Sequence, residues 1–221
     1  MTRFVIATVV ASTLASAASA GFTGYSVQRT ITANGNSQYQ VFANFDQSNL
    51  VFLNAFSFVN VSGTMNARNQ DFFVADGAVG TWQAGSSVSA ADRGEDSWVT
   101  ASGLATSSGW GSALDPGFAN GGTVGDINNG AGWYDATPGT ANNILAGGTQ
   151  GGYRMLLAQI VRSGNDEGQG LSVHSMQLAW KVAGTTTAIF GNGDFTIGFP
   201  VPAPGAMAVL GLAGLAGRRR R

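Results

Sequence analysis

Residues 38–61 read QYQVFANFDQSNLVFLNAFSFVNV, and this stretch decides the fold class of the chain. Successive side chains of a β-strand point to opposite sides. One face of a strand over 38–45 therefore carries Tyr39, Val41, Ala43 and Phe45. Residues 50–61 are an apolar run rich in Phe and Val, which predicts a strand buried on both faces. We expect these two strands to form the centre of the core.

Further strands are predicted on both sides of this pair. The segments with strand-like composition or alternation are 70–76, 95–101, 152–162, 171–183, 186–190 and 194–199. The pattern of 152–162 alone fits a strand or a helix, but the turn-forming residues that follow it favour a hairpin with 171–183. Gly191-Asn192-Gly193 predicts a second hairpin, between 186–190 and 194–199.

The body of the chain, residues 21–199, is therefore expected to be all-β, as an antiparallel β-sandwich or a jelly-roll-like domain. Residues 103–152 depart from the strand pattern, because fourteen of these fifty residues are Gly. We expect an ordered excursion across one face or end of the sandwich, with a short strand near Trp133. The chain has no Cys. Disulfides and thiolate chemistry are thus excluded, and the core alone must hold the domain.

The formal net charge of −1 is a sum over unlike parts of the chain. Five of the eleven basic residues lie at the two ends, at Arg3 and at 218–221, whereas all twelve acidic residues lie in the body. The body therefore carries a charge of −6. This balance argues against a nucleic-acid partner, because binding to phosphates needs clusters of Lys and Arg.

The first twenty residues have the organisation of an export signal. Arg3 provides a positive start, residues 4–14 are apolar, and Ala18-Ser19-Ala20 is a small-residue cleavage site. The apolar run is shorter than the about 20 residues that a membrane span needs. We predict a signal helix that is removed on export, so that the mature chain begins at Gly21 or Phe22.

Residues 200–221 have three parts. Proline recurs in the first part, which is therefore an extended segment that cannot join a helix. This segment contains the pentapeptide Val201, Pro202, Ala203, Pro204 and Gly205. Residues 206–217 are uncharged and predict a hydrophobic helix that anchors transiently in a membrane. The chain then ends in Arg218, Arg219, Arg220 and Arg221. Such a cluster marks the cytoplasmic side by the positive-inside rule.

This tail resembles the PEP-CTERM sorting signal of bacteria, in which a short Pro-rich motif precedes a hydrophobic helix and a terminal Arg cluster. Residues 201–205 match the position of the motif, although Ala203 stands where the motif has an acidic residue. The resemblance implies recognition by an exosortase-type membrane enzyme after passage through the export machinery. It also implies removal of the tail and delivery to the cell surface or the exopolysaccharide matrix. It assigns no activity to the body.

Candidate catalytic residues are few. His174 is the only imidazole of the chain, and it shares its strand face with apolar residues, which favours a buried histidine over a catalytic one. A Ser-His-Asp triad would need a serine and an acid beside it. Ser172 and Ser175 are close in sequence, but Ser175 points to the opposite face, and no Gly-x-Ser-x-Gly elbow occurs. We therefore predict that the protein is not an enzyme.

Acidic residues form two clusters in turn-like segments, one at Asp92, Glu95 and Asp96 and one at Asp166 and Glu167. Paired carboxyl groups of this kind could hydrolyse glycosides or bind Ca²⁺. Residues 126–130 also space oxygen atoms as a calcium loop does, but the later acidic ligand of the EF-hand is missing. We expect no cofactor and treat Ca²⁺ as a minor alternative.

Aromatic residues in the Gly-rich excursion suggest contact with sugars. Trp110, Trp133 and Tyr134 lie among Gly, Asn and Asp. Aromatic faces stack on pyranose rings, while amide and carboxylate groups bind hydroxyls. Together with the export signal, the resemblance of the tail implies an exported surface or matrix protein, for which we expect a structural or adhesive role. The alternatives are a carbohydrate-binding module for matrix polysaccharide and, third, a glycoside hydrolase.

Overall fold

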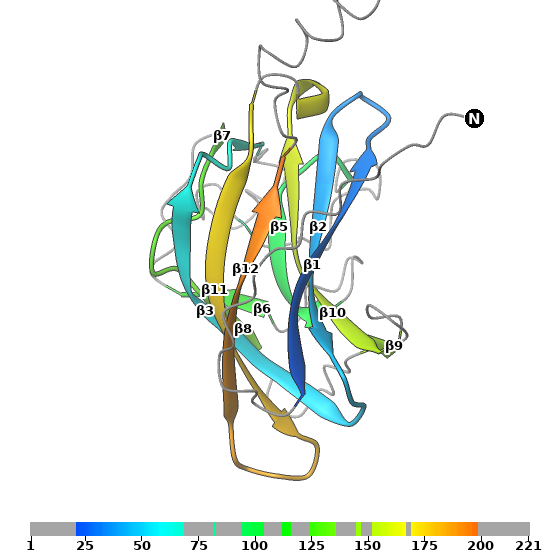
Figure 1. Cartoon of the computed structure of the whole chain (residues 1–221), viewed down its shortest axis with the longest axis vertical. Helices are drawn as coiled ribbons and strands as arrows, with labels where there is room; N and C mark the ends of the chain where they lie inside the picture. The colour runs from blue at the N-terminus through cyan, green and yellow to red at the C-terminus, as the bar shows by residue number, and fades with distance from the viewer. Residues whose placement is uncertain are drawn as a thin grey trace, which may run out of the picture.

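The computed structural model describes residues 21–68, 82, 94–103, 112–115, 124–135, 145–146, 152–166 and 169–198. They form two antiparallel sheets that pack face to face (Figure 1). The all-β prediction and the sandwich-like arrangement are thereby confirmed. The predicted strand 70–76, the signal segment 1–20 and the tail 200–221 lie outside the described residues. No helix within the described ranges is long and apolar enough to cross a membrane.

The first sheet has the strand order β1-β2-β10-β5, and β9 pairs with β10 beside this path. Its strands are β1 (Phe22–Ile31), β2 (Ser37–Phe45), β5 (Trp98–Gly103), β9 (Leu145–Ala146) and β10 (Tyr153–Arg162). Strands β2 and β10 are central and are buried on both faces over most of their length. The face turned away from the second sheet buries Phe42, Trp98 and Leu156. The guanidinium of Arg154 lies 4.2 Å from the centre of the Phe42 ring.

The second sheet has the order β12-β11-β3-β8-β6. Its strands are β3 (Leu50–Ser62), β6 (Ser112–Leu114), β8 (Trp133–Asp135), β11 (Ser172–Val182) and β12 (Ile189–Ile197). The short strands β4 (Ala67–Arg68) and β7 (Val124–Gly125) pair separately, and a 3-10 turn spans Gly164–Asp166. Strand β8 confirms the strand expected near Trp133. The described parts of the Gly-rich excursion thus contribute β6 and β8 to one edge of this sheet.

The core lies between the two sheets, and the stretch 38–61 is at its centre, as predicted. The predicted inward face of 38–45 is buried throughout, with exposed fractions of 3% or less. Strand β3, however, is buried on one face only, which corrects the expectation for 50–61. Leu50, Phe52, Ala55 and Phe58 point into the core. The residues of the opposite face are half-buried or exposed, since no third layer covers them along the described chain.

Both hairpins predicted for the C-terminal half are wrong. Strands β10 and β11 do not pair, because β10 lies in the first sheet and β11 in the second. The turn signals at 163–170 therefore mark a crossing between layers. Strand β11 pairs instead with β12, from Ser172 opposite Ile197 to Trp180 opposite Ile189.

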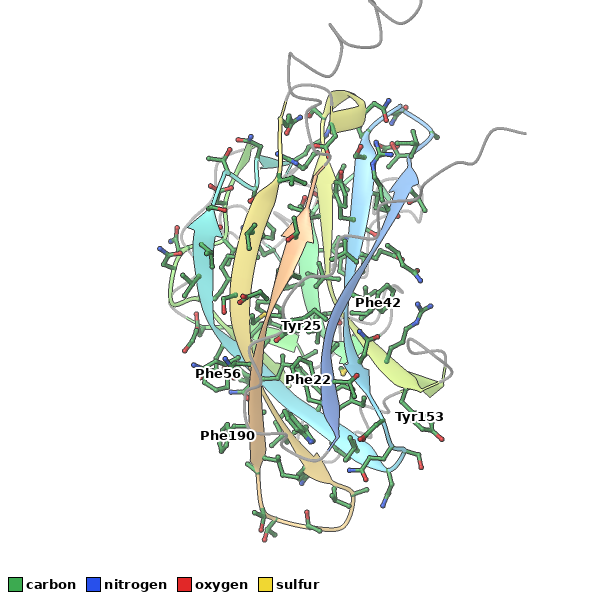
Figure 2. The ribbon with its side chains drawn as sticks, viewed as in Figure 1. Phe22, Tyr25, Phe42, Phe56, Tyr153 and Phe190 are labelled. Atoms are coloured by element: carbon green, nitrogen blue, oxygen red, sulfur yellow. The ribbon has the colours of Figure 1, made fainter. Side chains whose placement is uncertain are left out.

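The residues 191–193 are not a turn but the middle of β12. Their glycines serve packing. A Cβ on Gly191 would lie 2.9 Å from the Trp180 ring and 3.0 Å from the Phe22 ring. A Cβ on Gly193 would lie 3.3 Å from the ring of Tyr25. Figure 2 shows Phe22 and Tyr25 at the seam where β1 meets β12. The missing side chains of β12 make room for these rings.

Candidate functional site

His174 is buried among aromatic rings. Its side chain is fully buried, and its ring stacks on that of Phe58 with the centroids 5.3 Å apart. The ring of Phe195 is tilted against the imidazole, and their centroids are also 5.3 Å apart. A hydrogen bond of 2.7 Å joins its Nε2 to the hydroxyl of Ser172. Its Nδ1 has no hydrogen-bond partner among the described residues. Among the residues that the structure describes, the pair therefore lacks the third group that would orient the ring in a catalytic triad.

The environment of His174 keeps the imidazole neutral. Burial lowers its pKa from 6.5 to about 4; the charge of Asp126 acts in the opposite direction, and that of Arg162 acts with burial. A general base needs a pKa near the working pH and access to a substrate. His174 has neither, so its contacts are those of a structural core residue, as the sequence suggested.

Asp166, from the second acidic cluster, is a buried partner of Arg162. Nη1 of Arg162 lies 3.0 Å from a carboxylate oxygen of Asp166, and both side chains are fully buried. The other oxygen of Asp166 accepts a hydrogen bond from the hydroxyl of Tyr39. Burial, followed by this hydrogen bond and the charge of Asp166, raises the pKa of Tyr39 to about 12. Through Tyr39, Asp166 thus connects β2 to the segment after β10 that crosses to the second sheet.

Arg162 connects several segments at the same end of the sandwich. Its guanidinium donates to the carbonyl of Gly170 at 3.0 Å, to that of Thr64 at 3.3 Å and to the side chain of Gln169 at 3.1 Å. Gly198 has a φ of 101°, and a Cβ there would lie 2.6 Å from Nη1 of Arg162. The buried charge is therefore paired and hydrogen-bonded, as buried charges must be.

Glu95, from the first acidic cluster, fastens the turn between β1 and β2. Its carboxylate accepts hydrogen bonds from the Thr32 hydroxyl at 2.8 Å, the Asn34 backbone N–H at 3.1 Å and the Asn36 amide at 2.8 Å. Burial alone would raise the pKa of Glu95, but these hydrogen bonds and the charge of Arg68 lower it below its ordinary value. Glu95 and Asp166 lie on separate turns, while Asp92 and Glu167 lie outside the described residues.

The calcium-like loop 126–130 uses its oxygen atoms to bind neighbouring backbone. The carboxylate of Asp126 accepts from the N–H of Asn66 at 3.0 Å, and the side-chain oxygen of Asn129 accepts from the N–H of Asn60 at 2.7 Å. Asn60 lies in β3 and Asn66 follows this strand, so the two hydrogen bonds hold the loop against β3. Within the described ranges, no three His, Asp or Glu side chains come together as a metal site requires.

The three predicted sugar-contact residues do not form one platform. Trp133 is 1% exposed and donates its indole N–H to the carbonyl of Thr100 at 3.0 Å, so its ring fills the core. This placement corrects the expectation for Trp133. Tyr134 is the next residue of β8, faces the opposite side and is 44% exposed. Trp110 lies outside the described residues.

Two aromatic residues that sequence reasoning missed share the outer side of the second sheet with Tyr134. Phe190 of β12 is 61% exposed, and its ring meets that of Phe56 of β3 edge-to-face, with centroids 6.2 Å apart. Both lie on the side of the sheet away from β1 and β2 (Figure 2). Strict alternation from Leu50 would place Phe56 on the inner face with Phe52, but a register shift of β3 against β11 turns it outward, so the sequence concealed its exposure. The incorrect turn over 191–193 concealed it for Phe190.

Comparison with protein-family models, curated proteins and solved structures gives no match for this chain.

Proposed function

We propose that the chain is an exported, non-catalytic protein of the bacterial cell surface or extracellular matrix, with a structural or adhesive role. An exosortase-type enzyme would sort it through residues 201–205, the hydrophobic helix 206–217 and the arginines 218–221. A transient stay in the inner membrane would precede release. In this proposal both terminal segments are helices during export, and neither remains in the mature protein.

The position of the sandwich between the two signals carries this proposal. Strand β1 begins at Phe22, directly after the expected cleavage site, and β12 ends at Ile197, before the first proline of the tail. Removal of both ends would therefore leave every described strand intact. The Cys-free composition suits this fate, since the domain depends on its core and not on a redox environment.

The non-catalytic part of the proposal is supported by the engagement of the candidate catalytic groups. His174 is enclosed by rings, while Glu95 and Asp166 bind the turns at one end of the sandwich. A retaining or inverting glycosidase instead needs two carboxyl groups about 5 to 9.5 Å apart across a substrate cleft. The hydrolase alternative thus has no support from Glu95 or Asp166.

Expression of the full chain in a bacterium with an exosortase, and in the same strain without the enzyme, tests the proposal. We expect the body at the surface or in the medium of the first strain, and a membrane-bound chain with its tail in the second. Deletion of 218–221 should cause the same retention in the first strain. Lys181→Ala, which removes a positive charge from the body, is the control and should be sorted normally. An intact tail at the surface of both strains would contradict exosortase sorting.

A further inference from the structure

The side of the second sheet that faces away from the core carries a strip of rings and amides. It consists of Phe56, Tyr134, Gln177, Phe190 and Asn192, which we call the outer aromatic face. The strand pairings place Asn192, Gln177 and Phe56 in one row across three strands. The neighbouring row runs from Phe190 to Tyr134.

The second row shows how the rings come together. Phe190 pairs with Ala179, Ala179 with Asn54, and Asn54 with Tyr134. Ala179 is 3% exposed, and the ring of its partner Phe190 meets the ring of Phe56 edge-to-face. Three strand spacings of about 4.8 Å separate the ends of the row, so Phe190 and Tyr134 lie about 14 Å apart. This is a long, open strip rather than a closed pocket.

The composition of this strip fits one class of ligand. Exposed rings offer apolar faces for the C–H faces of pyranoses, and the exposed amides of Gln177 and Asn192 can both donate and accept hydrogen bonds to hydroxyls. Among the described residues of β3, β11 and β12 that face outward, only Lys181 and Asp194 are charged, and their charges are opposite. An acidic polysaccharide would need a basic surface, so the balanced charge of this face favours a neutral polysaccharide.

We propose that the outer aromatic face binds a neutral polysaccharide, with successive sugar rings lying along the row from Phe190 to Tyr134. This inference rests on the proposed extracellular role, because a matrix polysaccharide is the ligand available there. It gives that adhesive role a surface, and it replaces Trp133 by Phe190 and Phe56 as the rings beside Tyr134. A second copy of this chain is the competing occupant, which the experiment below distinguishes.

The test measures binding of the full chain, purified in mild detergent, to microcrystalline cellulose, chitin, galactomannan and mixed-linkage β-glucan, with alginate as the acidic comparison. We expect binding to at least one neutral polymer and weaker binding to alginate. Phe190→Ala and Tyr134→Ala should each weaken binding about tenfold, which corresponds to about 1.4 kcal/mol. Ile31→Ala is the matched control, because Ile31 is 49% exposed but lies on β1, and it should bind like the unchanged chain.

Unchanged thermal unfolding of Phe190→Ala would show that its loss of binding is local, since this side chain is largely exposed. Failure of the chain to bind any of the four neutral polymers would overturn the inference, as would equal binding by Phe190→Ala and Ile31→Ala. Sedimentation that shows a dimer of the unchanged chain and a monomer of Phe190→Ala would assign the face to self-association instead. Exosortase-dependent release is measured separately. Normal release without glycan binding would therefore refute this inference and leave the proposed sorting intact.

Discussion

The buried imidazole predicts a loss of stability in mild acid. In the unfolded chain His174 has a pKa near 6.5, whereas burial in the folded chain lowers its pKa to about 4. Between these two pH values His174 is protonated in the unfolded chain but neutral in the folded chain. The free energy of unfolding is therefore fully maintained above pH 6.5 and falls as the pH is lowered toward 4. Near neutral pH the imidazole is largely uncharged in both states, so the protonation penalty appears only in acid.

The size of this effect follows from the shift. A difference of about 2.5 pKa units corresponds to about 3 kcal/mol over the whole window, at about 1.4 kcal/mol per unit. About 2 kcal/mol of it should be lost between pH 7 and pH 5, where most carboxylates remain ionised. His174 is the only histidine of the chain. The pH 5–7 interval therefore reports chiefly on this one side chain.

Urea unfolding followed by tryptophan fluorescence at pH 7 and pH 5 measures the effect. The unchanged chain should lose about 2 kcal/mol, and His174→Gln, which cannot titrate, should lose much less although it starts from a lower stability. A second variant, Ser172→Ala with His174→Phe, keeps the cavity filled without the hydrogen-bonded pair and should show the same flat response. An equal loss in all three proteins, or an imidazole that titrates near 6.5 in the folded protein by NMR, would show that the burial of His174 does not cause the acid sensitivity.

Three further changes test the buried contacts. Arg162→Met leaves the carboxylate of Asp166 buried without its cation and should cost about 3–5 kcal/mol in urea unfolding; a cost below about 1 kcal/mol would mean that the pair is solvated. The ionised carboxylate of Glu95 stabilises the fold above pH 4.5, and this stability is lost as the pH falls through its lowered pKa. Glu95→Gln should lack this contribution, so the acid-unfolding curves of the variant and the unchanged chain should converge at low pH. Gly191→Ala should cost about 1–3 kcal/mol, because its Cβ overlaps two rings. Gly94→Ala, whose Cβ would meet nothing nearer than 3.9 Å, should change the stability little, and equal costs at both positions would argue against tight packing at Gly191.

The sequence predicted the fold class because alternation is a direct consequence of strand geometry. The buried face of 38–45 and the strand near Trp133 follow from patterns that involve only neighbouring residues. Pairing depends on distant residues, and this is where the predictions failed. The turn at 163–170 could as well close a hairpin as cross between layers, and the glycines at 191 and 193 gave no sign of the rings that fill their space.

The candidate site shows the same division. The burial of His174 was evident from its apolar neighbours on one strand face, and the structure places it between two Phe rings. The outer aromatic face could not be predicted, since Phe56, Tyr134 and Phe190 come from three strands that are far apart in sequence. Trp133 and Tyr134 looked equivalent in the sequence, but adjacent residues of a strand face opposite sides, so only Tyr134 is exposed.

The proposed sorting is tested most directly by the intact mass of the protein isolated from the surface fraction of exosortase-bearing cells. We expect a chain that begins at Gly21 or Phe22 and ends near Pro204, so that both the signal segment and the Arg-terminated helix are missing. A surface protein whose mass includes Arg221 would contradict it.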